Sequence, residues 1–245
     1  EMCIRDSRYV GVNFNSQGNP NLKPSDNYNL DLKWDFNPTP TELISLTAFY
    51  KLIKNPISRI EVASAGGYLS YENIADKATV AGVEIEIRKN LFVRPVSNAA
   101  HGMNKLSLGL NGSYIYTNAK MPLATVTTGS QLEGAAPWIV NFDLSHNFTK
   151  GERSFVNTLV LNYVSDKIYT IGTQGYQDIM EQGVLTLDFV SQAKLNKHLS
   201  LNLKARNLLN PSYKLSRKAN ENGEKVILND YKKGINISLG VSCTF

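Results

Sequence analysis

The sequence predicts an all-β protein, specifically an antiparallel transmembrane β-barrel fragment with about nine strands. Apolar and polar residues alternate through most of the 245 residues, which is the period of a strand with two different faces. Helical periodicity is essentially absent, and no stretch approaches the roughly eighteen consecutive apolar residues of a membrane-spanning helix. The mean hydropathy of −0.24 agrees with a membrane barrel, because only one face of each strand is apolar.

The composition excludes several other protein classes. Hydrophobic residues make up 42% of the chain and charged residues 19%, which excludes an acidic disordered segment and a collagen-like repeat. Two cysteines do not make a disulfide scaffold. The net charge is +5, but the basic residues are not interleaved with aromatic ones on a presenting element, so we expect no nucleic-acid partner.

Four strands are predicted in the first half of the chain. In 28–36 and 44–51 the even-numbered positions are apolar and the odd-numbered ones are polar, with Phe49 as the exception. In 81–88 the odd-numbered positions are apolar, whereas in 106–117 the even-numbered ones are. Each segment is near the length of about ten residues that crosses a bilayer at a tilt.

Five further strands follow. The segment 138–148 is apolar at even-numbered positions, and 185–193, 199–206 and 235–245 are apolar at odd-numbered positions. The segment 155–164 is apolar on both faces, so its orientation stays open.

The connectors predict which end of the sheet lies on which side of the membrane. Tight turns are expected at 37–42, 149–153 and 196–198. The connector 89–104 is an exception, because its length is intermediate. Long loops are expected at 54–75, 118–136, 166–183 and 209–230. Short turns at one end and long loops at the other are typical of an outer-membrane barrel, with the turns in the periplasm.

The two faces of the strands differ as a membrane barrel requires. The charged residues fall on the polar face, where they would line a lumen, and aromatic residues lie near strand ends, as in an interfacial girdle. The charges are Asp31, Lys33, Asp35, Glu84, Glu86, Arg88, Asp143, Asp188, Lys204 and Arg206. The aromatics are Tyr28, Trp34, Phe36, Tyr50, Tyr114, Tyr116, Trp138 and Phe148.

The ends of the chain carry separate expectations. Residues 1–7 share none of the alternation and resemble a translated sequencing adapter, so we set them aside as a non-native leader. Nine is an odd number of strands and leaves edges unpaired, which predicts further strands upstream. The terminal strand ends on Phe245 and resembles the last strand of bacterial outer-membrane proteins. We expect Leu239, Val241 and Phe245 to form the signal that the barrel-assembly machinery reads.

Several segments together resemble the C-terminal barrel of a TonB-dependent receptor, in the style common in Bacteroidota. The resemblance covers nearly everything from Tyr9 to Phe245, with a departure at Ser25 and Asp26, where the family commonly has a Glu after Lys-Pro. The segments are GNPNLKP at 18–24, SLTAFYKLIKNPI at 45–57, ADKATVAGVEIE at 75–86, GSYIYTNA at 112–119, AAPWIVNFDLSHNF at 135–148, LSLNLKARNLLNPSY at 199–213 and the closing strand.

The resemblance implies a 22-stranded barrel in the bacterial outer membrane, plugged by an N-terminal globular domain. The implied function is active import of a scarce or large nutrient, namely a siderophore, haem, cobalamin, a glycan or a peptide. Residues 8–245 would be the C-terminal portion of the barrel, without the plug through which TonB acts. The implied partners are TonB, the barrel-assembly machinery, outer-membrane lipid, lipopolysaccharide and, for glycan importers, a surface lipoprotein.

No enzyme active site, cofactor site or metal site is predicted. Glu84 and Glu86 point the same way, but lumen charges balanced by cross-strand Lys and Arg explain them better than a catalytic pair. His101, His146 and His198 are far apart in sequence and lack the spacing of metal ligands or of a catalytic triad.

Only the long loops offer ligand chemistry. Tyr68 and Tyr71 flank one loop and Tyr169 and Tyr176 another, and aromatic rings stack on sugars or on chelated iron complexes. The last loop and its flanks are basic and would attract an anionic ligand or lipopolysaccharide phosphates. Loop packing and simple solvation explain the same residues. The basic residues are Lys214, Arg217, Lys218, Lys225, Lys232 and Lys233, of which Arg217 and Lys218 are the preferred candidates.

Two other functions fit parts of the pattern. A passive outer-membrane channel or adhesin barrel would have the same strands without a plug upstream. A soluble carbohydrate-binding β domain is disfavoured, because the alternating Leu, Ile and Phe faces would expose a large apolar patch to water.

Overall fold

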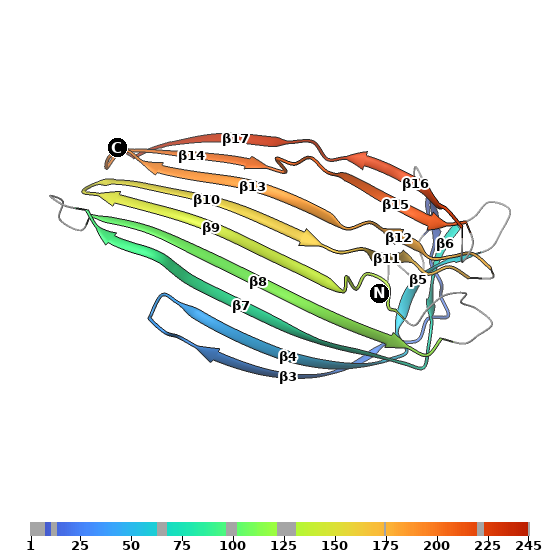
Figure 1. Ribbon diagram of the computed structural model, residues 1–245. Coiled ribbons are helices and arrows are strands. Elements are labelled where there is room, and N and C mark those ends of the chain that lie inside the picture. The colour runs from blue at the N-terminus through green and yellow to red at the C-terminus, as the bar shows by residue number, and fades with distance from the viewer. Residues whose placement is uncertain are drawn as a thin grey trace.

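A nine-stranded antiparallel sheet forms most of the molecule (Figure 1). The computed structural model describes residues 8–10, 14–62, 68–96, 102–121, 131–173, 175–219 and 223–244. The expected leader at 1–7, His101 and Phe245 lie outside these residues. In spatial order the strands of this main sheet are β17 (Asn236–Cys243), β14 (Leu199–Arg206), β13 (Val184–Lys194), β10 (Arg153–Val164), β9 (Trp138–Lys150), β8 (Met103–Ala119), β7 (Lys77–Pro95), β4 (Leu43–Lys54) and β3 (Asp26–Phe36).

All nine predicted strands are present, and each has the predicted position in the chain. Among the described residues no helix long and apolar enough to cross a membrane occurs.

The prediction of a connector of intermediate length at 89–104 was wrong. β7 runs on to Pro95 and β8 begins at Met103, so both strands extend well into the predicted connector. The register shifts between Asn90 and Phe92, because Leu91 is an extra residue in a β-bulge. The bulge exchanges the faces of all following residues, which is why the alternation stops near residue 88.

The main sheet does not close. β3 and β17 are its two edges, and neither has a second neighbour among the described residues. Side chains of both edge strands are exposed along their whole length. An open sheet of this kind is part of a barrel, as the odd number of strands predicts.

Two predicted long loops each contain two strands instead. β11 (Lys167–Thr170), β12 (Ile179–Glu181), β15 (Ser212–Lys218) and β16 (Lys225–Lys232) form a four-stranded sheet in this order, which we call the rim sheet. Each of its strands lies next in sequence to a strand of the main sheet and extends the wall beyond it (Figure 1). The prediction that 166–183 and 209–230 are loops was therefore wrong.

Short irregular breaks separate the rim sheet from the main sheet, and Asn and Asp side chains bridge them. Gly183 N donates to Asp166 Oδ1 at 2.6 Å, and Asn207 N donates to Asp188 Oδ1 at 2.8 Å. Asn207 and Asn210 have positive φ angles of 58° and 43°, which few residues other than Gly adopt readily. These side chains replace backbone partners at the breaks, so the period of two residues is lost there although the wall continues.

The predicted loop 54–75 is a hairpin. β5 (Ile57–Val62) pairs with β6 (Tyr68–Asn73). On its other side β6 pairs with β2 (Asn15–Gln17), which in turn pairs with β1 (Arg8–Val10). A parallel bridge between Ile60 and Ile171 joins this hairpin sheet to the rim sheet. Both small sheets lie at the end of the main sheet opposite the C-terminus (Figure 1).

The buried apolar core lies where the two small sheets meet the ends of β7 and β8. It brings together side chains from the hairpin, the wall and the segment before β9, so burial of apolar area fixes the hairpin against the wall. Its members are Ile60, Ile74, Ala75, Ala78, Ala119, Leu132, Ile168 and Ile171.

We predict that Gly82→Ala destabilises the sheet by about 1–3 kcal/mol, because a Cβ there would collide with the Phe49 ring and the Tyr114 carbonyl oxygen. Gly82 thus makes room for Phe49, the one large apolar side chain predicted on the polar face of 44–51. Gly109→Ala is the matched control, since the atoms nearest to its Cβ belong to the Asp143 carboxylate, which can rotate away. The free energy of unfolding in detergent micelles measures both, and an equal loss would contradict this account.

We predict that Glu42→Gln makes the unfolding free energy less dependent on pH in the acid range. Glu42 Oε1 accepts the Asn90 N–H at 3.0 Å beside the bulge and lies 3.4 Å from Lys89 Nζ. The Asn90 hydrogen bond and then Lys89 hold the pKa of Glu42 below its usual 4.5, against the effect of burial. The carboxylate therefore stabilises the fold above pH 4.5 and ceases to do so as the pH falls through the lowered pKa. Chemical unfolding at a series of pH values should show wild type and variant converging at low pH, and a constant difference would contradict the assignment.

Candidate functional site

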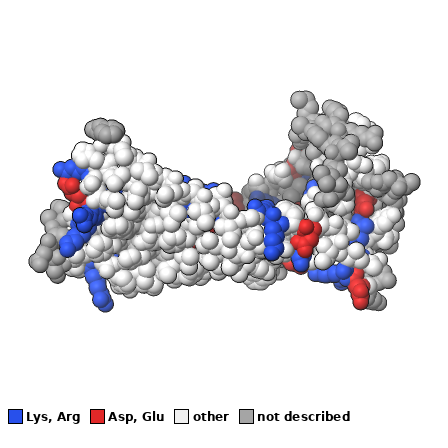
Figure 2. All heavy atoms as spheres, turned by 90° about the horizontal axis from the view of Figure 1, so that it is seen from above, with Lys and Arg blue, Asp and Glu red and all other residues white. Residues whose placement is uncertain are grey.

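One face of the main sheet is mostly apolar. Directly opposed residues of neighbouring strands share a face, so the register traces rows across the sheet. One row contains Trp34, Leu46, Ile85, Gly112, Val140, Tyr163 and Leu185. On the face seen in Figure 2, Lys, Arg, Asp and Glu side chains gather at the two ends and the central part is mostly free of them. This distribution suits a wall whose middle lies in lipid.

The register also decides the orientation of 155–164, which the sequence left open. Leu159 lies opposite Leu144 and Phe189, on the apolar face. Val160 lies opposite Asp143 and Asp188, on the polar face.

The opposite face carries the predicted lumen charges. A row on this face contains Asp35, Ser45, Glu86, Asn111, Asn141, Asn162 and Thr186. Glu86 pairs with Arg88 at 2.6 Å and Asp35 with Lys33 at 3.3 Å, so both acidic groups are balanced by a residue of their own strand. The expectation of cross-strand partners was wrong for Glu86.

The aromatic residues of the apolar face form an inclined line. From Tyr163 of β10, the row of directly opposed residues crosses five strand pairs and arrives at Trp34 of β3. The aromatic line instead meets β3 at Tyr28, which is six residues away from Trp34 along the strand. Tyr50, Tyr116, Tyr114 and Trp138 occupy the intermediate rows. With a rise of about 3.3 Å per residue and about 4.8 Å between strands, this shift corresponds to strands tilted by roughly 40° to the normal of the aromatic belt. Membrane barrels have strand tilts of this size.

A second aromatic line lies near the turns. On β9 and β10 it consists of Phe148 and Phe155, whose ring centroids are 6.5 Å apart. Trp138 and Phe148 are ten residues apart on one strand, which at a tilt of about 40° separates the two lines by roughly 25 Å along the normal. This separation equals the height of the apolar band of outer-membrane barrels. The two aromatic lines thus mark a membrane-sized band.

The predicted ligand residues lie beyond this band, at the end that carries the hairpin and rim sheets. Tyr169 belongs to β11, Tyr176 follows it, and Arg217 and Lys218 end β15. Tyr68 and Tyr71 belong to β6 and are partly buried, and the Tyr71 carbonyl oxygen accepts a hydrogen bond from Asn19 Nδ2. The structure thus brings Tyr169, Tyr176, Arg217 and Lys218 to the rim sheet and its connecting segment, whereas Tyr68 and Tyr71 lie in the hairpin sheet.

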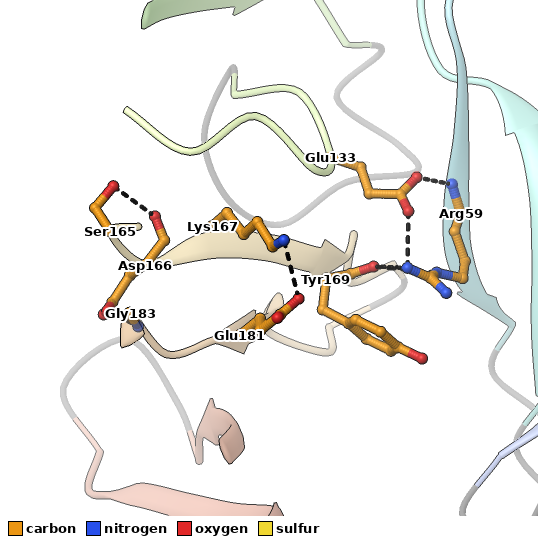
Figure 3. A network of polar contacts seen from close by, with 8 residues as sticks. All are labelled: Arg59, Glu133, Ser165, Asp166, Lys167, Tyr169, Glu181 and Gly183. Atoms are coloured by element: carbon orange, nitrogen blue, oxygen red, sulfur yellow. Dashed lines mark hydrogen bonds and ion pairs between the residues drawn. The ribbon is translucent and has the colours of Figure 1, made fainter. Parts of the chain in front are cut away.

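Arg59 is the centre of a polar network that holds these segments together (Figure 3). Its Nη2 donates to Glu133 Oε1 at 2.9 Å and to the Tyr169 carbonyl oxygen at 2.7 Å. Its guanidinium also lies 3.9 Å from the centroid of the Tyr169 ring. Sequence reasoning missed Arg59 and Glu133, because they are 74 positions apart and no local pattern links them.

A second arginine links the rim sheet to the hairpin. Arg217 forms an ion pair with Glu61 of β5, and its guanidinium lies 5.3 Å from the centroid of the Tyr176 ring. Arg217 Nε is buried and has no hydrogen-bond partner within the described part of the chain. Arg217 therefore links the rim sheet to the hairpin sheet, in addition to any contact that it makes with a ligand.

Two small cavities open on the rim sheet. One has a volume of about 150 Å³ and is lined by the stacked pair Tyr213 and Tyr231, with Tyr169, Glu181, Lys214, Leu215 and Asn229. The other has a volume of about 180 Å³ and is lined by Gln177, Asp178, Met180, Ser216, Arg217, Lys218 and Lys225. Three of the predicted ligand residues therefore line cavities, namely Tyr169, Arg217 and Lys218.

The terminal strand lies at one edge of the wall. Leu239 and Val241 lie opposite Leu203 and Leu201, on the apolar face. Their side chains are 71% and 61% exposed, on an outward face of a strand that has no outer neighbour among the described residues. His198, in the turn before β14, lies within hydrogen-bond distance of Thr244, the last described residue. Its Nδ1 is 2.7 Å from the Thr244 carbonyl oxygen.

The histidines do not converge. His146 is on β9 and His198 lies in the turn before β14, while His101 is outside the described residues. In the described part of the chain, no three His, Cys, Asp or Glu residues form a group that could hold a metal ion.

We predict that Arg59→Lys loosens the hairpin and rim sheets without affecting the main sheet. A lysine cannot donate to Glu133 and Tyr169 with the fixed fork of a guanidinium, and the loss should cost about 1–3 kcal/mol locally. Hydrogen exchange should then become faster in 57–62 and 167–171 and remain unchanged in 139–149. Unchanged exchange in both small-sheet segments would contradict the role of this network.

Comparison with known proteins identifies the family. The family model described as "TonB dependent receptor-like, beta-barrel" matches residues 5–208, which is most of the chain. No curated protein and no solved structure matches.

The matched range contains eight of the nine strands of the main sheet and ends before β17. The amphipathic antiparallel wall, its two aromatic lines and the family match agree. The chain belongs to the β-barrel family of TonB-dependent receptors, which are outer-membrane transport proteins.

Proposed function

We propose that residues 8–245 form the C-terminal part of an outer-membrane receptor that imports a scarce or large nutrient with energy supplied through TonB. The observation that carries this proposal is the open amphipathic wall with a folded rim at one end. The wall supplies a lipid-facing band and a polar lumen face, and its two unpaired edges need further strands to complete a barrel. Residues 1–7 are a non-native leader in this proposal.

The missing strands and the plug would precede this part in the full-length receptor. TonB would act on that plug, so no TonB-contacting residue is assigned in the present chain. The turn end of the wall faces the periplasm and the rim faces the outside of a bacterial cell, where lipopolysaccharide surrounds the barrel. The proposed function involves no catalytic step.

The rim is the proposed ligand-gathering surface. Tyr169 and the pair Tyr213 and Tyr231 offer aromatic faces at one cavity, and Lys218 and Arg217 offer cations at the other. Such a surface suits siderophores, haem, cobalamin, glycans or peptides, all of which present rings, carboxylates or both. A surface lipoprotein would be a further partner for a glycan ligand.

Assembly would depend on the terminal strand. Leu239 and Val241 lie on the apolar face of an edge strand with an unpaired side, and Phe245 completes the pattern in sequence. We propose these three residues as the signal for the barrel-assembly machinery.

The test begins with the native gene. We expect its reading frame upstream of codon 8 to encode a signal peptide, a globular plug and about thirteen further strands, taking 22 strands for the complete barrel. A start codon and signal peptide immediately before codon 8 would overturn the import proposal and favour a passive channel or an adhesin.

We predict that uptake by the full-length receptor requires TonB and an intact rim. Deleting TonB should abolish growth on the limiting nutrient, whereas a passive channel would be unaffected. Tyr176→Ala and Lys218→Gln should each weaken nutrient binding by about threefold to tenfold, the range for one ring or charge contact. Lys150→Gln, at the turn end of β9, is the matched control and should bind normally. Radiolabelled uptake and equilibrium binding measure these effects, and a normal affinity in both rim variants would contradict the assigned surface.

A further inference from the structure

A cluster of polar side chains interrupts the apolar face of the wall inside the membrane band. His146 on β9, Asn157 on β10 and Ser191 on β13 lie opposite one another in a single row of this face. The rows on either side are apolar at these strands, with Leu144, Leu159 and Phe189 above and Phe148, Phe155 and Ala193 below. Asn104 of β8 lies in the lower row, opposite Phe148.

The depth of this polar cluster follows from the aromatic lines. His146 and Asn157 are each two residues from Phe148 and Phe155, the line nearer the turns. At a strand tilt of about 40°, two residues correspond to about 5 Å along the normal. His146 and Asn157 therefore lie just inside the band, at the level where acyl chains meet the glycerol and phosphate groups of a lipid, and Asn104 lies one row nearer the turns.

The hydrogen bonds within the cluster leave mainly donors free. His146 Nε2 lies 2.8 Å from Asn104 Oδ1, and Ser191 Oγ donates to Asn157 Oδ1 at 2.7 Å. Both amide oxygens are thus engaged, while the amide nitrogens of Asn104 and Asn157 have hydrogens left to donate. Lipid phosphates and ester carbonyls are acceptors only, so they complement this surface.

A cation stands beside the cluster. Arg94 of β7 lies directly opposite Asn104 on the same face, after the bulge at Leu91 has exchanged the faces of β7. Its side chain is exposed, and its guanidinium lies 5.6 Å from the centroid of the Phe92 ring. Because the bulge is what turns Arg94 outward, the charge is absent from this face in a regular β7.

We propose that Arg94, Asn104, His146 and Asn157 form a binding site for the phosphate and glycerol ester groups of a phospholipid. Arg94 pairs with the phosphate at the membrane surface, and the amides donate to phosphate or ester oxygens slightly deeper. Leu144, Leu159 and Phe189, in the row farther into the band, lie beside the acyl chains. The assignment to a phospholipid of the periplasmic leaflet rests on the proposed function, because that function places the turn end in the periplasm.

The test uses the full-length receptor, delipidated in detergent. Native mass spectrometry and an affinity titration would compare phosphatidylglycerol, phosphatidylethanolamine and dioleoylglycerol, which lacks the phosphate. We expect both phospholipids to be retained and dioleoylglycerol to be lost. Arg94→Gln and Asn157→Leu should each weaken phospholipid binding by about tenfold.

The controls keep the test specific. Arg88→Gln removes an arginine from the same strand but on the lumen face, where it pairs with Glu86, and should bind phospholipid normally. Asn157→Leu extends the apolar surface and should not prevent folding, which a heat-modifiability gel verifies.

Three results would overturn the proposal. Equal phospholipid binding in wild type, Arg94→Gln and Asn157→Leu would mean that the lipid is held nonspecifically. Retention of dioleoylglycerol would mean that the acyl chains alone are recognised. Displacement of phosphatidylglycerol by lipid A at lower concentration would assign the site to the outer leaflet. Lipid binding is measured without transport, so failure of this site and failure of TonB-dependent import are separate results.

Discussion

Every backbone N–H and C=O group inside a membrane must be paired within the protein, and the rest of this structure depends on that constraint. Between β3 and β17 the antiparallel ladders satisfy it, with one bulge at Leu91, and only the outer sides of these two edge strands lack a partner among the described residues. Continuous ladders in turn fix which residues lie opposite one another. One apolar and one polar face therefore extend across the whole sheet, and a change of register in one strand would mix them.

Outside the membrane band the constraint is relaxed, and the wall changes character there. Water and side chains can serve as partners, so Asp166, Asp188 and Asn207 take part in breaks that separate the main sheet from the rim sheet. The buried core is also found at this end, because the hairpin and rim sheets pack against each other and against the wall there. Arg59 and Arg217 connect the rim to the hairpin by contacts with Glu133, Tyr169 and Glu61, so the candidate ligand surface is a cross-linked unit.

The sequence predicted the main sheet well and the rim poorly. Eight of the nine strands were found from the alternation, because the partition of each side chain between lipid and lumen is a local property, and 155–164 was found as an apolar segment. The strands of the rim and of the hairpin were missed, because they are short, have no constant apolar side and are separated from the wall by bridged breaks. Of the candidate ligand residues, Tyr169, Arg217 and Lys218 line cavities. Arg59, the centre of the polar network, was missed because no local sequence pattern indicates its role.

The sequence by itself determined the fold class, the number of wall strands and the face of nearly every side chain in them. The tertiary structure alone decided the orientation of 155–164, since both of its faces are apolar and only the partners Leu144 and Asp143 distinguish them. It also decided the outward position of Arg94 and the convergence of Arg59 with Glu133. These features depend on pairing between residues far apart in the chain, and a local pattern of hydrophobicity contains no information about such pairing.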